Sequence, residues 1–186
     1  MITIPDIIIV GKNEADRILS QLDWREKIRH VCSIGEVQTR RPNGFKQVQG
    51  NKLRLEFDDI EREKMLSGYE GCTQEHIDQA VEWCARVAAD PQPTLIHCAA
   101  GQRRSTAVAL LLLATLLGPG QEAQAVAHLH AAVQSTHARK LRAFPHMQPN
   151  RRVVWMGDAT LGRRGLLFHA LIEGFPEGTF RPGFVP

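Results

Sequence analysis

The sequence predicts an α/β fold: one domain with a central, mostly parallel sheet of about four to five strands, flanked by helices. Short runs rich in Ile, Val and Leu alternate along the chain with longer segments whose apolar residues recur at helical spacing. This alternation is typical of parallel sheets, because parallel strands need crossover connections that are usually helices. The 186 residues suit a single domain, with a core over about residues 7–171 and an irregular tail over 174–186.

Four short apolar runs predict the strands of this sheet. The third, LRLEF, alternates apolar and polar side chains as a half-buried strand does. The second ends at Gly35, and the third stops abruptly at Asp58 and Asp59. The predicted strands are residues 7–10, 30–34, 53–57 and 94–97.

Helices are predicted between and after these strands. Asn13 can cap the first helix and Thr73 the second, while the polar residues 38–51 predict a surface loop. The apolar stretch 107–117 is too short for a bilayer span of about 20 residues, so we expect a buried helix and no membrane span. The predicted helices are residues 13–22, 74–89, 106–117, about 121–133, and two shorter segments around Val153 and Leu167.

Composition narrows the class of protein. The chain is 43% hydrophobic and 23% charged, as ordinary folded proteins are, and its net charge of +3 does not indicate a nucleic-acid partner. The four cysteines lack C-x-x-C spacing and no signal peptide is evident, so we expect a reducing, cytoplasmic setting. We also expect no metal and no cofactor, because no ligand set with metal spacing accompanies His128, His130 and His137.

Residues 97–105, HCAAGQRRS, join the last predicted strand to the apolar helix. The backbone N–H groups of this junction can curl around one centre and cradle a phosphate or another oxyanion. Gly101 permits a positive φ or a close backbone approach. Arg104 adds a planar fork that can grip two oxygens of a tetrahedral anion. The predicted phosphate-binding residues are Ala99, Ala100, Gly101, Gln102, Arg103 and Arg104.

Cys98 lies at the base of this predicted cradle. The helix N-terminus, the N–H groups and Arg104 favour a thiolate there, and a thiolate is a nucleophile for phosphorus. We expect His97 to support the loop by hydrogen-bonding nearby backbone, and Ser105 to offer its hydroxyl to the departing sulfur. A lone cysteine is usually a small buried apolar residue, but the whole pattern between a strand and a helix favours catalysis.

The pattern HC-x5-R-S resembles the signature of the cysteine-dependent protein tyrosine phosphatase superfamily, in its compact dual-specificity-like branch. The resemblance implies a hydrolase that cleaves phosphomonoesters through a phosphocysteine intermediate. It implies Cys98 as the nucleophile, Arg104 as the phosphate-binding arginine and Ser105 as the hydroxyl that assists breakdown of the intermediate. The implied substrate is a phosphorylated protein or peptide, foremost phosphotyrosine, with dual specificity left open.

This chemistry also needs an acid that protonates the leaving oxygen and later activates water. The family's pattern of an aromatic residue, an acid and an aspartate resembles Phe57, Asp58 and Asp59, which implies Asp59 as the general acid and Asp58 as the reserve. The alternative interpretation of the pair is a solvated turn in which one aspartate caps the residues that follow. The later stretch MQPNRRVVWMGDATLG resembles the Pro-Asn helix start near the end of such domains. The resemblance implies that Asn150 caps that helix and can brace the loop of residues 98–104.

Several alternatives stay open. A pseudophosphatase that only binds phosphorylated partners is one, and a rhodanese-like sulfurtransferase is another, although its active loops are usually shorter. Ala99 and Gln102 replace the lysines that phosphoinositide-directed relatives often carry, which disfavours inositol lipids, while Arg103 can face outward and shape substrate choice. The sequence decides neither phosphotyrosine against phosphoserine nor the oligomeric state. Two clusters of basic residues can either border the pocket and attract an anionic substrate or lie on a solvated face. They consist of Arg40, Arg41, Lys46, Arg151, Arg152, Arg163 and Arg164.

Overall fold

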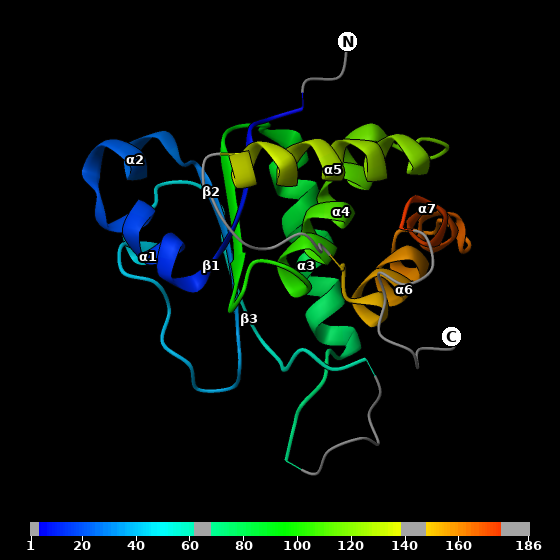
Figure 1. Ribbon diagram of the computed structural model, residues 1–186, viewed down its shortest axis with the longest axis horizontal. Coiled ribbons are helices and arrows are strands. Elements are labelled where there is room, and N and C mark those ends of the chain that lie inside the picture. Colours follow the sequence, from blue (N-terminus) through cyan, green and yellow to red (C-terminus); the bar gives the residue numbers. More distant parts are fainter. Residues whose placement is uncertain (1–3, 62–67, 139–147, 176–186) are drawn as a thin grey trace.

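A parallel sheet forms the centre of the protein, whose computed structural model describes residues 4–61, 68–138 and 148–175. Within these residues four strands pair in one sheet, and every neighbouring pair is parallel. The predicted α/β fold is therefore confirmed, with helices on both faces of the sheet (Figure 1). In spatial order the strands are β1 (Ile7–Gly11), β4 (Thr94–Cys98), β2 (His30–Gly35) and β3 (Lys52–Glu56).

The helices divide between the two faces of the sheet (Figure 1). The smaller group consists of α1 (Lys12–Ser20), α2 (Leu22–Lys27) and the 3₁₀ helix η1 (Phe45–Gln47). Leu19 and Phe45 from this group pack on Val10 and Leu95 of the strands. The opposite face carries α3 (Gln74–Ala89), α4 (Arg104–Leu117), α5 (Glu122–Ala138), α6 (Arg151–Thr160) and α7 (Leu166–Gly174).

Helix α4 is the centre of the larger core. It is buried along almost its whole length, because it packs on β4 and is covered by α3, α5 and α6. This confirms the buried helix expected from its apolar sequence. Gly157 allows α6 to lie close to α4, since a Cβ at that position would come within 2.4 Å of Leu111. Among the helices that the structure describes, none is both long enough and apolar enough to cross a bilayer.

The N-terminal helix differs from the prediction. Asn13 was predicted to cap a helix over residues 13–22, but α1 begins at Lys12 directly after Gly11, and no side chain caps it. The reason is that the Lys12 N–H already donates to the Ala99 carbonyl at 3.1 Å. The helix also breaks at Gln21, whose extended backbone (ψ 124°) separates α1 from α2.

The later elements agree more closely with the prediction. Thr73 caps α3 as expected, and its side chain accepts a hydrogen bond from the His76 N–H in a capping box. Asn150 caps α6 by accepting from Val153 N–H at 3.2 Å. The predicted loop 38–51 contains only η1 among the regular elements described there. Most of the tail expected over 174–186 lies outside the described residues.

Candidate active site

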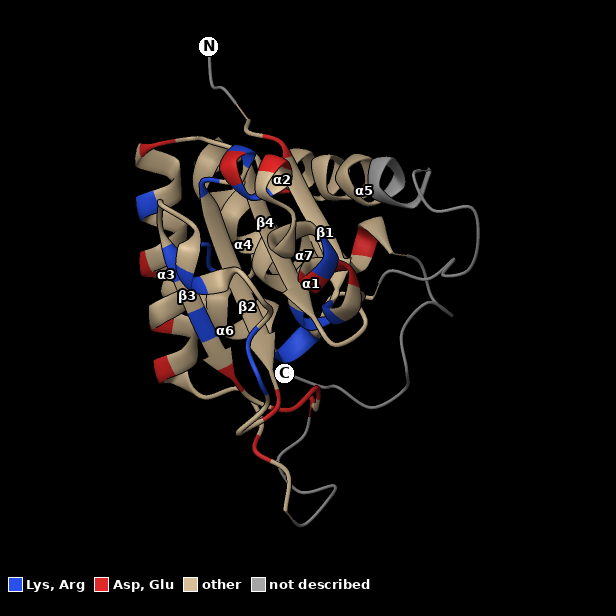
Figure 2. Ribbon diagram, turned by 90° about the vertical axis from the view of Figure 1, so that its left-hand side faces the viewer, with Lys and Arg blue, Asp and Glu red and all other residues tan. Residues whose placement is uncertain are grey.

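The site lies where the carboxyl ends of the parallel strands meet. In the register of the sheet, Cys98 at the end of β4 lies opposite Gly11 at the end of β1, and Gly35 lies opposite Glu56. Acidic residues gather on the segment that follows β3, at the lower edge of the sheet in Figure 2. Ligands of open α/β sheets bind outside this edge, so the fold itself indicates the position of the site.

Residues 98–104 form the loop between β4 and α4, called the phosphate loop below. The Gly101 N–H donates to the Cys98 sulfur at 3.2 Å, so the loop folds back over the thiol. Gly101 has a φ of 76°, and a Cβ there would lie 2.5 Å from the Val10 carbonyl carbon. Both the backbone angle and the close approach therefore require glycine, as the sequence indicated.

The outer side of the phosphate loop is held by its neighbours. The carbonyl of Ala99 accepts a hydrogen bond from Lys12 N–H at the start of α1. The carbonyls of Gln102 and Arg103 accept from the N–H groups of residues 148 and 150, at 3.3 and 3.1 Å. These three carbonyls therefore bond to groups outside the loop, whereas the Gly101 N–H bonds to the Cys98 sulfur.

Cys98 is 2% exposed and lies beside two hydrogen-bonding groups. Besides the Gly101 N–H, the Ser105 hydroxyl oxygen lies 3.2 Å from the sulfur. Both can donate to a negatively charged sulfur and stabilise it. Cys98 and Ser105 thus lie as close together as their predicted roles require.

His97 lies beneath the phosphate loop in β4. Its Nε2 atom is 2.8 Å from the hydroxyl of Ser33 in β2, and Arg54 in β3 donates to that same hydroxyl at 2.8 Å. Burial lowers the pKa of His97 to about 4, although its backbone contact with Cys98 opposes this shift. The ring is therefore neutral at pH 7 and joins three strands below the loop.

Arg104 is almost fully buried at the start of α4, and its side chain reaches the ends of β2 and β3. One terminal nitrogen donates to the Phe57 carbonyl at 2.7 Å, and the other donates to a Glu36 carboxylate oxygen at 2.6 Å. Its Nε is buried and has no hydrogen-bond partner among the residues described by the structure. The Nε–H at this edge of the guanidinium can therefore donate a hydrogen bond to a bound anion.

Glu36 is a site residue that sequence reasoning missed. Partial burial acts to raise the pKa of Glu36, but the hydrogen bond and charge of Arg104 outweigh it and hold the pKa below its ordinary value. The residue directly follows β2, which is adjacent to β4, so its place at the end of a central strand was the available signal.

The two adjacent aspartates after β3 lie in different surroundings. An Asp59 carboxylate oxygen accepts from the Asn150 side-chain amide at 2.8 Å and from Arg103 Nε at 3.2 Å. Asp58 instead accepts from the Glu70 N–H at 2.8 Å, and its own N–H donates to the Glu70 carbonyl. Asp59 is thus tied to the phosphate loop, whereas Asp58 closes the base of the connection to α3.

Arg103 does not face outward. Its side chain is 18% exposed, and Nη2 donates to a Glu61 oxygen at 2.7 Å. That same oxygen accepts from the Arg151 N–H at the start of α6. Glu61 is a further site residue that sequence reasoning missed, because its contact with Arg103 joins residues 42 positions apart and leaves no local signal.

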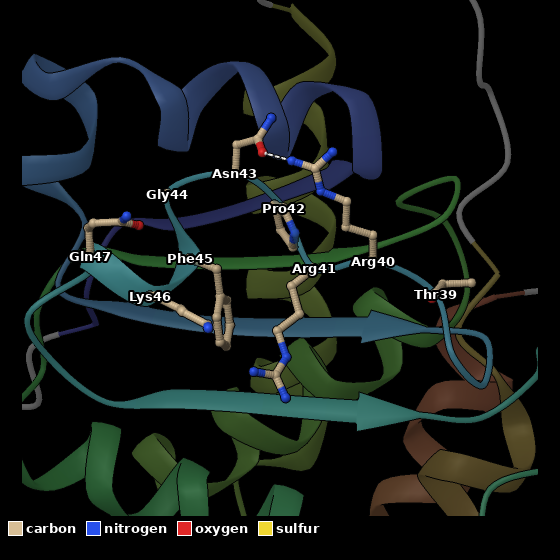
Figure 3. A pocket seen from close by; sticks show the side chains of 9 residues that line it. All are labelled: Thr39, Arg40, Arg41, Pro42, Asn43, Gly44, Phe45, Lys46 and Gln47. Carbon is tan, nitrogen blue, oxygen red and sulfur yellow. Dashed lines mark hydrogen bonds between the residues drawn. The ribbon is translucent and has the colours of Figure 1, made fainter.

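Four of the predicted basic residues lie elsewhere. Arg163 is buried and donates to the Ala114 carbonyl at 2.7 Å, about 15 Å along α4 from Arg104 at 1.5 Å per residue, so it does not border the phosphate loop. Arg40, Arg41 and Lys46 line a separate hollow of about 450 Å³, formed by residues 39–47 beside β2 and β3 (Figure 3). There the Arg41 guanidinium lies over the Phe45 ring.

In the part of the chain that the structure describes, no group of three or more His, Cys, Asp or Glu side chains is placed to hold a metal ion. Cys32, Cys72, Cys84 and Cys98 are all free thiols.

Comparison with known proteins identifies the family of this chain. The model of a family described as "Tyrosine phosphatase family" matches residues 15–148. No curated protein sequence matches the chain at a significant level. Among solved structures, human DUSP28 is 16% identical with a TM-score of 0.53, and the match covers 86% of this chain and 96% of that one.

Two further structures share the fold. The human tyrosine phosphatase-like serine/threonine/tyrosine-interacting protein is 18% identical, with a TM-score of 0.54 and coverage of 84% of this chain and 91% of that one. DUSP15 is 20% identical, with a TM-score of 0.51 and coverage of 96% and 97%. At identities of 20% or less, this similarity establishes the fold alone.

Proposed function

Because this chain belongs to the tyrosine phosphatase family, we propose that it hydrolyses phosphomonoesters, foremost protein phosphotyrosine, through a phosphocysteine intermediate. One observation carries the proposal: the Cys98 sulfur accepts a hydrogen bond from the loop that folds over it and lies 3.2 Å from the Ser105 hydroxyl. Arg104, at the end of this loop, reaches the residues that follow β2 and β3, and Asp59 contacts the loop through the Arg103 side chain. These contacts support the proposal that Cys98 acts as nucleophile, Arg104 as anion-binding group and Asp59 as acid.

In the first step the Cys98 thiolate attacks phosphorus. A bond forms between sulfur and phosphorus while the bond to the substrate oxygen breaks, and Asp59 donates its proton to that leaving oxygen. The N–H groups of the phosphate loop and the Nε of Arg104 bind the non-bridging oxygens as charge develops on them. The leaving alcohol or phenol departs neutral.

In the second step water attacks phosphorus from the side that the leaving group vacated. Asp59, now ionised, accepts the proton of the water, and the sulfur leaves as a thiolate. The Ser105 hydroxyl, 3.2 Å from the sulfur, stabilises the charge that returns to it. Inorganic phosphate is released, and both Cys98 and Asp59 return to their starting protonation states.

Glu36 and the Phe57 carbonyl hold Arg104 in place for both steps. Each accepts from a different terminal nitrogen of the guanidinium, so its orientation is fixed by the ends of two strands. His97 supports the loop from below through Ser33. A fixed guanidinium costs little reorganisation when the anion binds, which is how a preformed site accelerates a reaction.

Protein phosphotyrosine is the substrate class that the loop favours. The side chains of Ala99, Ala100 and Gln102 carry no charge, and Arg103 is occupied by Asp59 and Glu61. Besides Arg104, the only cation on the phosphate loop is Arg103, and a ligand with several phosphate groups would have to compete for it with these two carboxylates. We propose phosphotyrosine first, with phosphoserine and phosphothreonine as substrates that a peptide panel would test.

The wider setting is proposed on similar grounds. Four free thiols, one of them the proposed nucleophile, suit a reducing, cytoplasmic compartment. We also propose that the whole chain of 186 residues acts as one catalytic domain, whose partner is the phosphorylated protein.

The first test is hydrolysis of para-nitrophenyl phosphate by the purified protein in the presence of a metal chelator. We expect turnover, inhibition by vanadate, and loss of turnover on Cys98→Ser. Cys72→Ala is the matched control, because Cys72 is also buried but its thiol lies beside Thr73 at the start of α3. Activity that survives Cys98→Ser would overturn the mechanism, and tight phosphopeptide binding without turnover would make the protein a binding module.

A further inference from the structure

Arg103 connects two parts of the proposed active site that are far apart in sequence. Its backbone belongs to the phosphate loop, and its side chain reaches the segment after β3. Nε donates to Asp59 at 3.2 Å, Nη2 donates to Glu61 at 2.7 Å, and Nη1 donates to Gln148 at 3.3 Å. Every nitrogen of the guanidinium thus has its own acceptor, a pattern that the single ammonium group of lysine cannot reproduce.

Each carboxylate at Arg103 also has a second donor at the start of α6. Asp59 accepts from the Asn150 side chain at 2.8 Å, and Glu61 accepts from the Arg151 backbone N–H at 3.0 Å. Both acids are therefore held from two sides, by the phosphate loop and by a helix N-terminus. The segment that contains the proposed general acid is fixed at two positions.

The backbone of Arg103 is held independently of these side-chain contacts. Its carbonyl accepts from Ala107 N–H in α4 and from Asn150 N–H, both at about 3 Å. The three side chains are mostly buried, at 18% exposed for Arg103, 28% for Asp59 and 13% for Glu61, so loss of the arginine also lowers stability. What the side chain of Arg103 supplies is the position of the acids.

We propose that Arg103 is a positioning residue that holds Asp59, together with Glu61, against the phosphate loop before the substrate binds. The inference rests on the proposed function, in which Asp59 protonates the leaving oxygen. A displacement of about 1 Å is enough to cost a catalytic group about a hundredfold in rate. Arg103 therefore acts on the step that uses the proton and leaves phosphate binding by Arg104 unchanged.

Leaving groups of different basicity separate this role from a general loss of structure. A phenol is about as basic as tyrosine and needs the proton, whereas para-nitrophenol is much more acidic and departs without it. For Arg103→Leu we expect kcat/KM with phenyl phosphate to fall about 10–100-fold, while kcat/KM with para-nitrophenyl phosphate falls only about 2–3-fold, because kcat/KM reports the step in which the leaving group departs. Inhibition by inorganic phosphate should stay within about twofold of wild type, because Arg104 is intact.

The test is a double-mutant cycle of Arg103→Leu and Asp59→Ala, measured with both substrates. In the Asp59→Ala background, Arg103→Leu should lower kcat by at most about a further twofold, because the two residues act through one group. Arg103→Lys should restore part of the rate with phenyl phosphate, and Glu61→Gln should lower it less than Arg103→Leu does. Arg86→Leu is the matched control, since it removes an exposed arginine that pairs with Glu82 on α3.

The outcomes distinguish this inference from the proposed function. If Asp59→Ala lowers kcat/KM selectively for phenyl phosphate but Arg103→Leu and Arg103→Lys keep the leaving-group dependence of the wild type, the positioning role is wrong and the mechanism stands. Equal losses of kcat/KM with both substrates, or multiplicative effects in the double variant, also contradict the positioning role. If the wild-type protein hydrolyses neither substrate, the proposed function fails and the inference fails with it.

Discussion

Adjacent residues of the same type have different partners in this site. Arg103 reaches Asp59 and Glu61, whereas Arg104 reaches Glu36 and the Phe57 carbonyl. Where a strand ends or a helix begins, successive side chains leave the backbone in different directions, so one residue of a pair faces the site and the other braces it. The same division separates Asp58, bound to the Glu70 backbone, from Asp59.

The two aspartates therefore differ in what their removal changes. We expect Asp59→Ala to lower kcat for phenyl phosphate about 10²–10⁴-fold, the usual range for losing a general acid, with little change in inhibition by phosphate. Asp58→Ala should instead lower the free energy of unfolding by about 1 kcal/mol, because the Glu70 N–H loses its acceptor, and it should change kcat far less. Steady-state kinetics and urea unfolding of both variants measure this. A larger loss of kcat for Asp58→Ala than for Asp59→Ala would show that Asp58 is the general acid.

The phosphate loop depends on how β4, α4 and the start of α1 fit together. Gly101 packs against the backbone of Val10 and Gly11, where β1 passes into α1. A backbone cannot withdraw from such a contact as a flexible side chain can. The position of the loop is thus set by the junction of two elements that precede it by about ninety residues in sequence.

Gly101→Ala tests this fit. A Cβ would lie 2.5 Å from the Val10 carbonyl carbon at a φ of 76°, so we expect unfolding stability to fall by about 3 kcal/mol and most turnover to be lost. Gly118→Ala is the matched control, because Gly118 has a φ of 83° at the end of α4 but open space around it. That change should cost only about 1–2 kcal/mol and leave kcat intact. Similar losses in both variants would show that the backbone angle matters and the contact does not.

The sequence predicts the elements better than the contacts between them. Strand ends, the Thr73 cap and the HCAAGQRRS junction have local signals, and the structure places them where those signals indicated. The partners of the arginines have none, since Glu36 and Glu61 lie 68 and 42 positions from the residues they bind. Asn13 shows the opposite error, because a good capping residue lost its role once Lys12 N–H bonded to the phosphate loop.

Across the whole molecule, the site lies on a buried polar layer that joins the strands. His97, Ser33 and Arg54 come from β4, β2 and β3, and their side chains meet through the Ser33 hydroxyl. All three strands end at the site, so this layer holds the phosphate loop, Glu36 and the acidic segment in one frame. Global unfolding and the protonation of His97 are therefore linked.

The pH dependence of unfolding reports this linkage. The pKa of His97 is about 4 in the folded protein and about 6.5 in the unfolded chain, so the unfolded state binds the proton first. The stabilisation from neutral His97 is complete above about pH 6.5 and is lost as the pH falls to about 4, by roughly 3 kcal/mol. Urea unfolding of wild type and His97→Asn between these limits should show the stability difference shrink by that amount. If the stability difference between wild type and His97→Asn instead stays constant over this pH range, His97 takes up its proton equally readily in the folded and the unfolded protein.

Covalent phosphate on Cys98 is the central claim, and acid quenching during turnover of para-nitrophenyl phosphate tests it most directly. Peptide mass spectrometry after the quench should find one phosphate on the peptide that contains Cys98, should find more of it in Asp59→Ala because water is activated slowly, and should find none in Cys98→Ser. Phosphate on any other residue, or steady turnover with no phosphate bound to the protein at any time, would contradict the account.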